Sequence, residues 1–297
     1  MTMNAHAEDA PTASVLRYAA FTRDGQGGNP AGVVLDADAL DDAERLRIAA
    51  DVGYSETAFV DAPSDRTYRV RYFSPLAEVA FCGHATVAAA VALAERDGPG
   101  DVVFETLAGL IPVQVAGKGA DLTATLTSAP TRTRPAEIEE LDTALQALNW
   151  SHDDLDVRYP PHVAFAGNDH LIIAVSSRAR LADLNYHFEA LSRLMEEHSW
   201  TTVHLVHAQG PSDFAARDPF PPGGVVEDPA TGAAAAAFGG YLRELGMLDL
   251  PARVTVTQGE DMGSPSRLVV DIASDDERVQ VTGAAERIPA NSPGHPG

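Results

Sequence analysis

The sequence predicts an α+β protein made of two similar halves, each with a central helix wrapped by strands. One order of elements, two strands, a helix, two strands, a helix and three strands, occurs twice along the 297 residues. Such a repeated order indicates an internal duplication. One helix of the second copy contains five consecutive alanines, Ala233–Ala237, followed by Gly239 and Gly240, so surrounding strands could approach it closely. The length also suits two domains of ordinary size.

In the first half, a Gly-rich turn at residues 25–30 separates the first two predicted strands. Asp41–Val52 reads as an amphipathic helix with an acidic first turn. A second, small-residue helix is expected to start near His84 and to run to about Arg96. The strands are expected at Val15–Phe21, Ala31–Leu35, Thr57–Val60, Tyr68–Phe73, Val102–Thr106, Ile111–Val115 and Leu122–Leu126.

The second half repeats this arrangement. An amphipathic helix is expected at Asn185–Glu197, and a small-residue helix from near Pro229 or Ala230 to about Glu244. We therefore predict domains at residues 14–130 and 131–288, with disordered tails at 1–13 and 289–297. The strands are expected at His162–Ala166, Leu171–Val175, Thr202–His207, Phe214–Arg217, Val254–Thr257, Leu268–Ile272 and Arg278–Thr282.

Charge and cysteine content exclude several classes of function. There are 43 acidic and 21 basic residues, for a formal net charge of −22. Such a surface repels phosphate backbones and anionic lipids, so we expect neither a nucleic-acid nor a membrane partner. The one cysteine, Cys82, excludes an internal disulfide, and the histidines show no metal-ligand spacing, so no metal site is predicted. With no signal-peptide pattern at residues 1–14, we expect a cytoplasmic protein.

Two segments lead into the small-residue helices and could form one binding site. Free backbone N–H groups at a helix N-terminus bind anions. If both helices point into one cleft between the halves, the amides of Gly83, His84, Gly232 and Ala233 would hold a carboxylate from two sides. The alternative is that Gly83 and Gly232 merely permit close packing.

Three side chains are candidates for proton chemistry. Asp228, followed by Pro229, fits an N-cap, and it either caps the helix or orients a substrate in the cleft. Glu56 lies where a helix ends and a strand begins, and partial burial there would suit it to proton transfer, although a glutamate in such a place is more often exposed. His84 could shuttle a proton near neutral pH, or could be a core histidine.

Five motifs, in this order, resemble those of the PhzF-like family, the phenazine-biosynthesis isomerases of the diaminopimelate epimerase-like fold. They are Gly28-Asn29-Pro30-Ala31-Gly32, Ser55-Glu56-Thr57, Cys82-Gly83-His84-Ala85-Thr86, Glu227-Asp228-Pro229-Ala230-Thr231-Gly232 and the segment 258–266. The resemblance implies two domains, each a curved, mainly antiparallel sheet rolled around a central helix, with the site between them. It also implies a cofactor-free isomerase that is commonly a homodimer.

By the same resemblance, Glu56 is the catalytic glutamate, and His84 and Asp228 are the other catalytic residues. Asn29 and the amides of Gly83, Gly232 and Ala233 would contact the carboxylate of a small acid. The expected reaction moves a proton within that acid, with Glu56 as general acid and base. There are two alternatives to this isomerase: a one-base amino-acid racemase or epimerase, and a small-molecule-binding protein on the same fold that catalyses no reaction.

Three departures from the family pattern bear on the substrate. Ala233 stands where many members have Ser, which puts the dihydro-hydroxyanthranilate substrate in doubt. Residues 217–224 read RDPFPPGG instead of an R-x-F-x-P arrangement, so this wall of the cleft could differ. Related racemases use two thiols, whereas Cys82 is alone and is expected to pack in the core.

Overall fold

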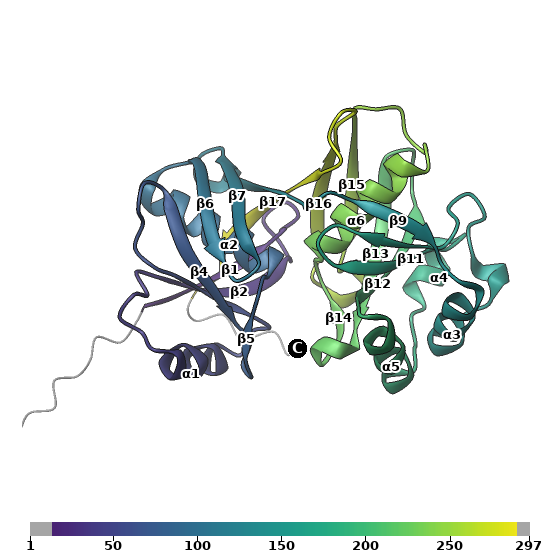
Figure 1. The fold of residues 1–297 in the computed structure, drawn as a ribbon, viewed down its shortest axis with the longest axis horizontal. Coiled ribbons are helices and arrows are strands. Elements are labelled where there is room, and N and C mark those ends of the chain that lie inside the picture. The colour runs from purple at the N-terminus through teal and green to yellow at the C-terminus, as the bar shows by residue number, and fades with distance from the viewer. Residues whose placement is uncertain (1–13, 290–297) are drawn as a thin grey trace, which may run out of the picture.

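The computed structural model describes residues 14–289, so the two predicted tails lie outside the described residues, apart from Pro289. Two lobes lie side by side, and the chain passes between them after about residue 130 and again near its end (Figure 1). Within residues 14–289, no helix is both long enough and apolar enough to cross a membrane.

Eight strands close into a barrel around helix α2 in the first lobe. The order around the barrel is β1, β2, β3, β4, β6, β7, β8 and β17, and β17 pairs back to β1. The elements are β1 (Val15–Ala20), β2 (Asn29–Leu35), α1 (Asp42–Val52), β3 (Thr57–Val60), β4 (Thr67–Phe73), β5 (Glu78–Val79), α2 (Gly83–Asp97), β6 (Gly100–Thr106), β7 (Gly109–Ala116) and β8 (Thr123–Thr127).

The second lobe wraps a similar sheet around helix α6. Its strand order is β9, β10, β11, β12, β13, β15, β16 and β17. The elements are β9 (Arg132–Pro135), α3 (Ile138–Leu148), β10 (His162–Phe165), β11 (Asp169–Ala174), α4 (Arg178–Ala182), α5 (Phe188–His198), β12 (Trp200–Ala208), β13 (Asp213–Phe220), β14 (Val225–Asp228), α6 (Gly232–Glu244), β15 (Ala252–Gln258), β16 (Ser266–Ile272) and β17 (Val279–Arg287).

The pairing directions confirm the predicted duplication. From β1 to β8 successive pairs run antiparallel, parallel, antiparallel, parallel, antiparallel and antiparallel, and the pairs from β10 to β17 follow the same series. The sheets are therefore mainly antiparallel and wrapped around a helix, as expected. Strand β17 pairs with β16 over 279–282 and with β8 and β1 over 280–287, so it belongs to both lobes. The boundary at residue 130 remains a prediction.

Small residues let the strands approach the central helices. Eleven residues of α2, from His84 to Ala94, are buried, which matches its surroundings of strands. In α6, a Cβ added at Gly240 would lie 2.4 Å from the Thr131 Cβ, and one at Gly239 would lie 2.7 Å from a methyl group of Val270. These positions tolerate only glycine without a shift of their neighbours.

The start of helix α6 differs from the prediction. We expected Asp228 as N-cap and Pro229 as the first helical residue, but the helix begins at Gly232 with Thr231 as N-cap, and Asp228 ends strand β14. The carboxylate of Asp228 is engaged by side chains instead of the helix amides, so it does not cap. Five further elements were not predicted. Four of them are short, namely strands β5, β9 and β14 and helix α4. The fifth, helix α3, lies outside the repeated order.

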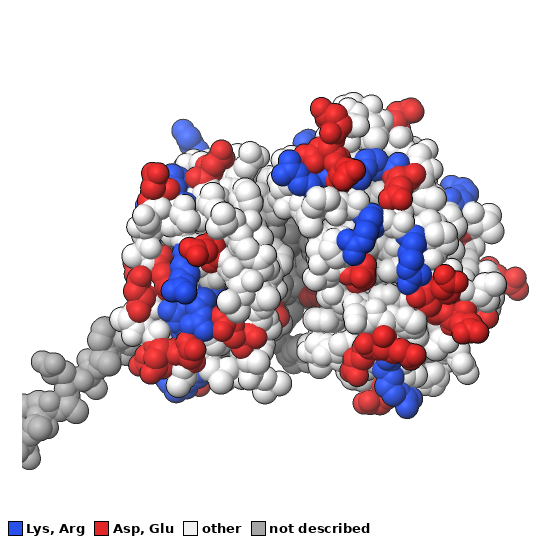
Figure 2. Space-filling model, viewed as in Figure 1, with Lys and Arg blue, Asp and Glu red and all other residues white. Residues whose placement is uncertain are grey.

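Charged side chains of both signs spread over the outer faces of the two lobes in Figure 2, whereas the walls of the furrow between the lobes are mainly uncharged in this view. The candidate residues come together where the lobes meet.

Candidate active site

Asn29 connects the two lobes. It begins β2 in the first lobe and is almost fully buried. Its amide nitrogen lies 2.6 Å from the Asp228 Oδ1 and 3.3 Å from the Ala230 carbonyl oxygen, both in the second lobe, and 3.2 Å from the Nδ1 of His84. One side chain thereby brings His84 and Asp228 into a single site, as the motifs predicted.

Glu56 and His84 face each other in the first lobe. The Nε2 of His84 lies 3.4 Å from the Glu56 Oε2, and Ser55 Oγ also lies 3.4 Å from this nitrogen. Because Asn29 donates to Nδ1, the ring proton belongs on Nε2, which then points at the carboxylate. Burial lowers the pKa of His84, with a smaller opposing effect of Glu56, so the ring is neutral at neutral pH.

Cys82 is buried, as expected, but it also borders this pair. It is the N-cap residue of α2, and its Sγ lies 3.5 Å from the Glu56 Oε2 and 3.4 Å from the His84 Nδ1. Burial, together with the nearby Glu56, raises the pKa of the thiol well above its ordinary value. The neutral thiol is therefore a poor nucleophile, which argues against covalent catalysis by Cys82.

Asp228 is held in the same site as a neutral acid. Thr231 Oγ1 lies 2.6 Å from its Oδ2, and Gln258 donates to its carbonyl oxygen at 2.7 Å and to the Thr231 hydroxyl at 3.0 Å. Burial raises the pKa of Asp228 to about 8, although the hydroxyl of Thr231 acts in the opposite direction. Gln258 begins the fifth sequence motif, residues 258–266, but no role in the site was assigned to it from the sequence.

A second carboxylate adds to this shift. Asp218 on β13 is directly opposite Asp228 in the antiparallel pair, so both side chains lie on one face of the sheet, with Cβ atoms roughly 5 Å apart. Asp218 is fully buried and accepts hydrogen bonds from Thr202 at 2.8 Å and from the Nδ1 of His204 at 2.9 Å. Its negative charge raises the pKa of Asp228. Sequence reasoning missed Asp218 because its partners come from another strand.

No N-cap side chain occupies the backbone amides at the N-termini of α2 and α6, the two helix ends at which an anion is expected to bind. Within residues 14–289, the side chains of Cys82 and Thr231 make no capping hydrogen bond to α2 or α6. A Cβ at Gly83 would meet nothing within 4 Å, so packing does not explain that glycine. At Gly232 the added Cβ would lie 3.3 Å from the Phe21 ring, so close packing contributes there. Gly83, Gly232 and Ala233 all retain partial exposure.

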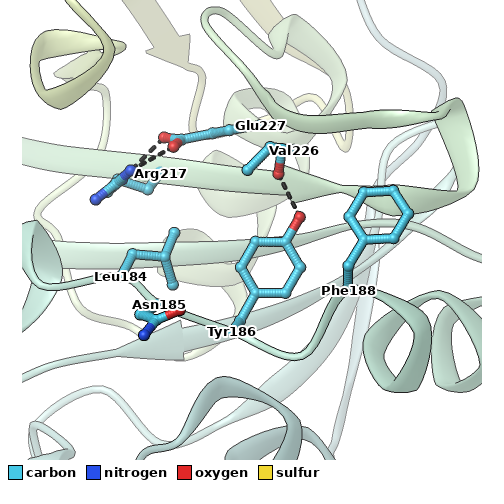
Figure 3. Close-up of a pocket in the computed structure, with 7 residues that line it drawn as sticks. All are labelled: Leu184, Asn185, Tyr186, Phe188, Arg217, Val226 and Glu227. Atoms are coloured by element: carbon cyan, nitrogen blue, oxygen red, sulfur yellow. Dashed lines mark hydrogen bonds and ion pairs between the residues drawn. The ribbon is translucent and has the colours of Figure 1, made fainter.

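A cavity lies on the opposite face of the β13–β14 pair (Figure 3). In it, the Arg217 guanidinium holds the Glu227 carboxylate in a two-point ion pair and also donates to the Ala182 carbonyl oxygen at 2.8 Å. Arg217 is thus fully engaged and unsuited to bind a substrate anion. The residues that line the cavity are Leu184, Asn185, Tyr186, Phe188, Arg217, Val226 and Glu227.

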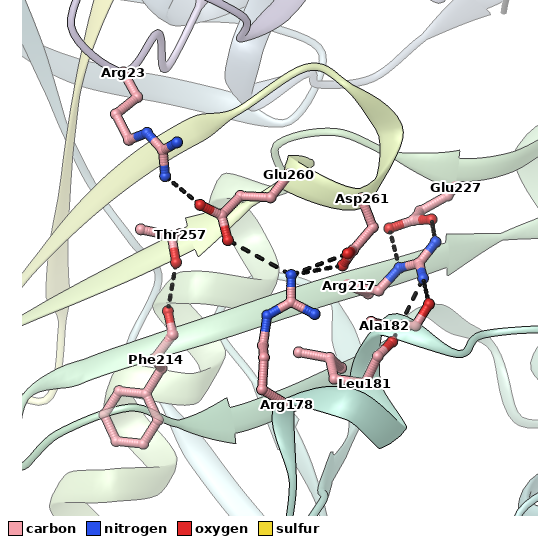
Figure 4. Close-up of polar contacts among 10 residues, drawn as sticks. All are labelled: Arg23, Arg178, Leu181, Ala182, Phe214, Arg217, Glu227, Thr257, Glu260 and Asp261. Carbon is pink, nitrogen blue, oxygen red and sulfur yellow. Dashed lines mark hydrogen bonds and ion pairs between the residues drawn. The ribbon is translucent and has the colours of Figure 1, made fainter.

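An ion pair joins the two lobes and continues as a row of charges in the second lobe (Figure 4). Arg23, between β1 and β2, pairs with Glu260 of the second lobe. Arg178 contacts the same Glu260 at 3.6 Å and Asp261 at 2.9 Å. Within this row, the Arg23–Glu260 pair links the two lobes, as the Asn29 amide does.

Comparison with known proteins identifies the family. Residues 18–288 match the model of the family described as phenazine biosynthesis-like protein. The chain is 31% identical to the uncharacterized isomerase YfhB of Bacillus subtilis over 92% of this chain and 96% of that protein. It is 29% identical to the trans-2,3-dihydro-3-hydroxyanthranilate isomerase of Pseudomonas chlororaphis, over 80% and 83% of the two chains. The crystal structure of the phenazine biosynthesis protein of Bacillus anthracis, of the PhzF family, superposes with a TM-score of 0.83 at 28% identity, over 93% and 96% of the two chains. The α+β fold class is confirmed, and the chain belongs to the phenazine biosynthesis-like (PhzF) family.

Proposed function

We propose that this isomerase of the PhzF family moves a proton within a small carboxylic acid without a cofactor, with Glu56 as the general acid and base. The observation that carries the proposal is the position of Glu56. Its side chain is 17% exposed, its Oε2 lies 3.4 Å from the His84 Nε2, and it stands beside the open N-terminus of α2. The carboxylate is thus reachable by a small substrate and oriented by the protein.

The helix ends would bind the carboxylate of the substrate. Amides of Gly83 and His84 from one lobe, and of Gly232 and Ala233 from the other, favour an anion and would stabilise negative charge that develops during proton transfer. Neutral Asp228 fits this role, because an ionised carboxylate there would repel the incoming anion. The net charge of −22 therefore does not prevent the site from accepting an acid.

In the reaction, Glu56 would remove a proton from carbon and return it at another carbon on the same face of the substrate. Neutral His84 would donate its Nε2–H to Glu56 and hold the carboxylate in place. The relative from Pseudomonas chlororaphis is named for trans-2,3-dihydro-3-hydroxyanthranilate. Ala233 cannot supply a hydroxyl to such a substrate, so we propose only the class, a small unsaturated or amino-bearing acid.

The test is proton exchange measured by NMR in deuterated water, with small acids first selected by thermal shift. Glu56→Gln should lower the exchange rate by about 10²–10⁴-fold, the usual contribution of a general acid or base. Glu78→Gln is the matched control, because that glutamate pairs with Arg71 at 2.7 Å outside the site. Unchanged turnover in Glu56→Gln would refute the assignment, and inversion at a single stereocentre would identify a racemase instead.

A further inference from the structure

We propose that the two carboxylate oxygens of Glu56 have different roles: Cys82 and His84 hold Oε2, and Oε1 takes the substrate proton. Cys82 is thereby a positioning residue, which goes beyond the packing role expected from the sequence. This inference rests on the proposed function of Glu56 as the general acid and base. The contact between the thiol and the carboxylate does not depend on that function.

The side-chain contacts of the Glu56 carboxylate fall on one of its oxygens. The thiol of Cys82 donates to Oε2 at 3.5 Å, and the Nε2 of His84 lies 3.4 Å from the same oxygen. Within residues 14–289, no group donates a hydrogen bond to Oε1. The side chain is 17% exposed, and a base needs a free lone pair within reach of the substrate. Oε1 is therefore the oxygen that is left for the reaction.

The proton of the thiol has one good acceptor. Burial, together with the nearby Glu56, raises the pKa of Cys82 well above its ordinary value, so the sulfur keeps its proton and can donate it. The Nδ1 of His84 lies 3.4 Å from the sulfur, but this nitrogen already accepts from Asn29 at 3.2 Å. A carboxylate is also a stronger acceptor than a neutral imidazole. The S–H bond is therefore directed at Oε2 of Glu56.

The thiol supplies a donor that His84 alone does not secure. The ring has one N–H at Nε2, and two oxygens, Ser55 Oγ and Glu56 Oε2, each lie 3.4 Å from that nitrogen. When the ring donates to Ser55, the thiol is the remaining donor to Oε2. Cys82 thus keeps the carboxylate in one orientation, whichever of the two oxygens the ring donates to.

The backbone on both sides of this contact is held in place. Cys82 is the N-cap residue of α2, and its carbonyl oxygen accepts from the Thr86 amide at 3.0 Å and from the Thr86 hydroxyl at 2.6 Å. Tyr72 of β4 contacts that hydroxyl at 2.6 Å, and both Tyr72 and Thr86 are fully buried. The carbonyl oxygen of Glu56 accepts from the Gly32 amide at 3.1 Å. The thiol and the carboxylate therefore meet from fixed positions, as a positioning group requires.

The consequence for the reaction is a fixed direction of the base. Oε1 would take the proton from carbon and return it, while Oε2 keeps its hydrogen bond to the thiol. Cys82 itself exchanges no proton with the substrate and forms no bond to it. Because helix amides and not the thiol would bind the substrate carboxylate, loss of the thiol should lower kcat and leave KM nearly unchanged.

The S–H stretching band in the Raman spectrum of the full chain tests the hydrogen bond. Only Cys82 can give this band, because the chain has no other cysteine, and donation to a carboxylate lowers the frequency of the band. Glu56→Gln replaces the charged acceptor by a neutral one, so the band should move to higher frequency. Glu78→Gln is the control, because that glutamate pairs with Arg71, and it should leave the band in place. A band that does not move in Glu56→Gln would overturn the inference.

Proton exchange in deuterated water, on the small acid selected by thermal shift, tests the positioning role. Cys82→Ala should lower kcat about 5- to 10-fold, the equivalent of one ordinary hydrogen bond, with KM nearly unchanged. Val91→Ala is the matched control, because this buried side chain lies in the same helix, roughly 13 Å further along its axis. It should lower the stability in urea and keep the kcat of the wild type. An equal loss of kcat in the two variants would overturn the role of Cys82.

The two measurements also separate this inference from the proposed function. A band that shifts in Glu56→Gln, with undiminished turnover in that variant, would refute Glu56 as the base and with it the role of Oε1, but not the hydrogen bond. A large loss of turnover in Glu56→Gln, with the kcat of the wild type in Cys82→Ala, would keep Glu56 as the base and refute Cys82 as its positioning residue.

Discussion

Asp228→Asn tests the claim that Asp228 is kept neutral, through the pH dependence of stability. The amide is nearly isosteric with the protonated acid: its oxygen can accept from Asn29, and its NH₂ group can donate to the Thr231 hydroxyl. The variant should therefore fold like the wild type, but it has no group that ionises at this position.

The size of the effect follows from linkage. Burial raises the pKa of Asp228 from 3.8 to about 8 in the folded chain, so stability from this group is complete below pH 3.8 and is lost as the pH rises towards 8. Each pH unit in this window removes up to about 1.4 kcal/mol from the wild type and nothing from Asp228→Asn. Partial exposure of Asp228 makes this slope an upper bound. The variant should therefore be the more stable protein at pH 7, by as much as ~4 kcal/mol.

Urea unfolding of both proteins measures this difference. The experiment covers roughly pH 4.5 to 8, the range between the pKa values of Asp228 in the unfolded and in the folded chain. Asp276→Asn is the control, because pairing with Arg278 lowers the pKa of that exposed carboxylate to about 2, and its effect lies below the window. A free-energy difference between Asp228→Asn and the wild type that stays constant from acidic to alkaline pH would refute the neutral acid.

Three substitutions test other parts of the site. Gly28→Ala should destabilise the fold by about 2 kcal/mol or more in thermal or urea unfolding, because φ is 84° and the new Cβ would lie 2.6 Å from the Ala20 carbonyl oxygen. Gly83→Ala should leave the stability within about 0.5 kcal/mol but raise KM, because its Cβ would enter the free space proposed for the substrate; an unchanged KM would argue against binding there. Asn29→Ala should cost about 1–3 kcal/mol and lower kcat, because it leaves the partly buried Asp228 without its donor from the first lobe; wild-type stability would contradict the bridging role.

The sequence predicted the elements well where local pattern decides them. The predicted strand Thr57–Val60 is observed with the same bounds, and the small-residue helices lie where the alanine runs occur. Glu56 and His84 were identified because each stands at the boundary of an element, inside a short motif. Such boundaries are readable because strand and helix periodicities change there.

Features that depend on contacts between distant segments could not be read in advance. Nothing local in Val279–Arg287 shows that one strand completes the barrel of the first lobe and also pairs with β16 in the second. The N-cap prediction for Asp228 failed for a related reason. Its best partners are Asn29, far away in the chain, and the hydroxyl of Thr231, and these compete with the helix amides for the carboxylate.

Asp218 shows most clearly how the structure changes the interpretation of charge. By composition it is one of 43 acidic residues, most of which add to a repulsive surface. By position it is fully buried, held by Thr202 and His204, and it lies opposite Asp228 across one strand pair. Burial raises the pKa of Asp228 to about 8, and the nearby Asp218 acts in the same direction. Asp228 therefore keeps its proton at neutral pH, which suits the proposed binding of an anionic substrate beside it.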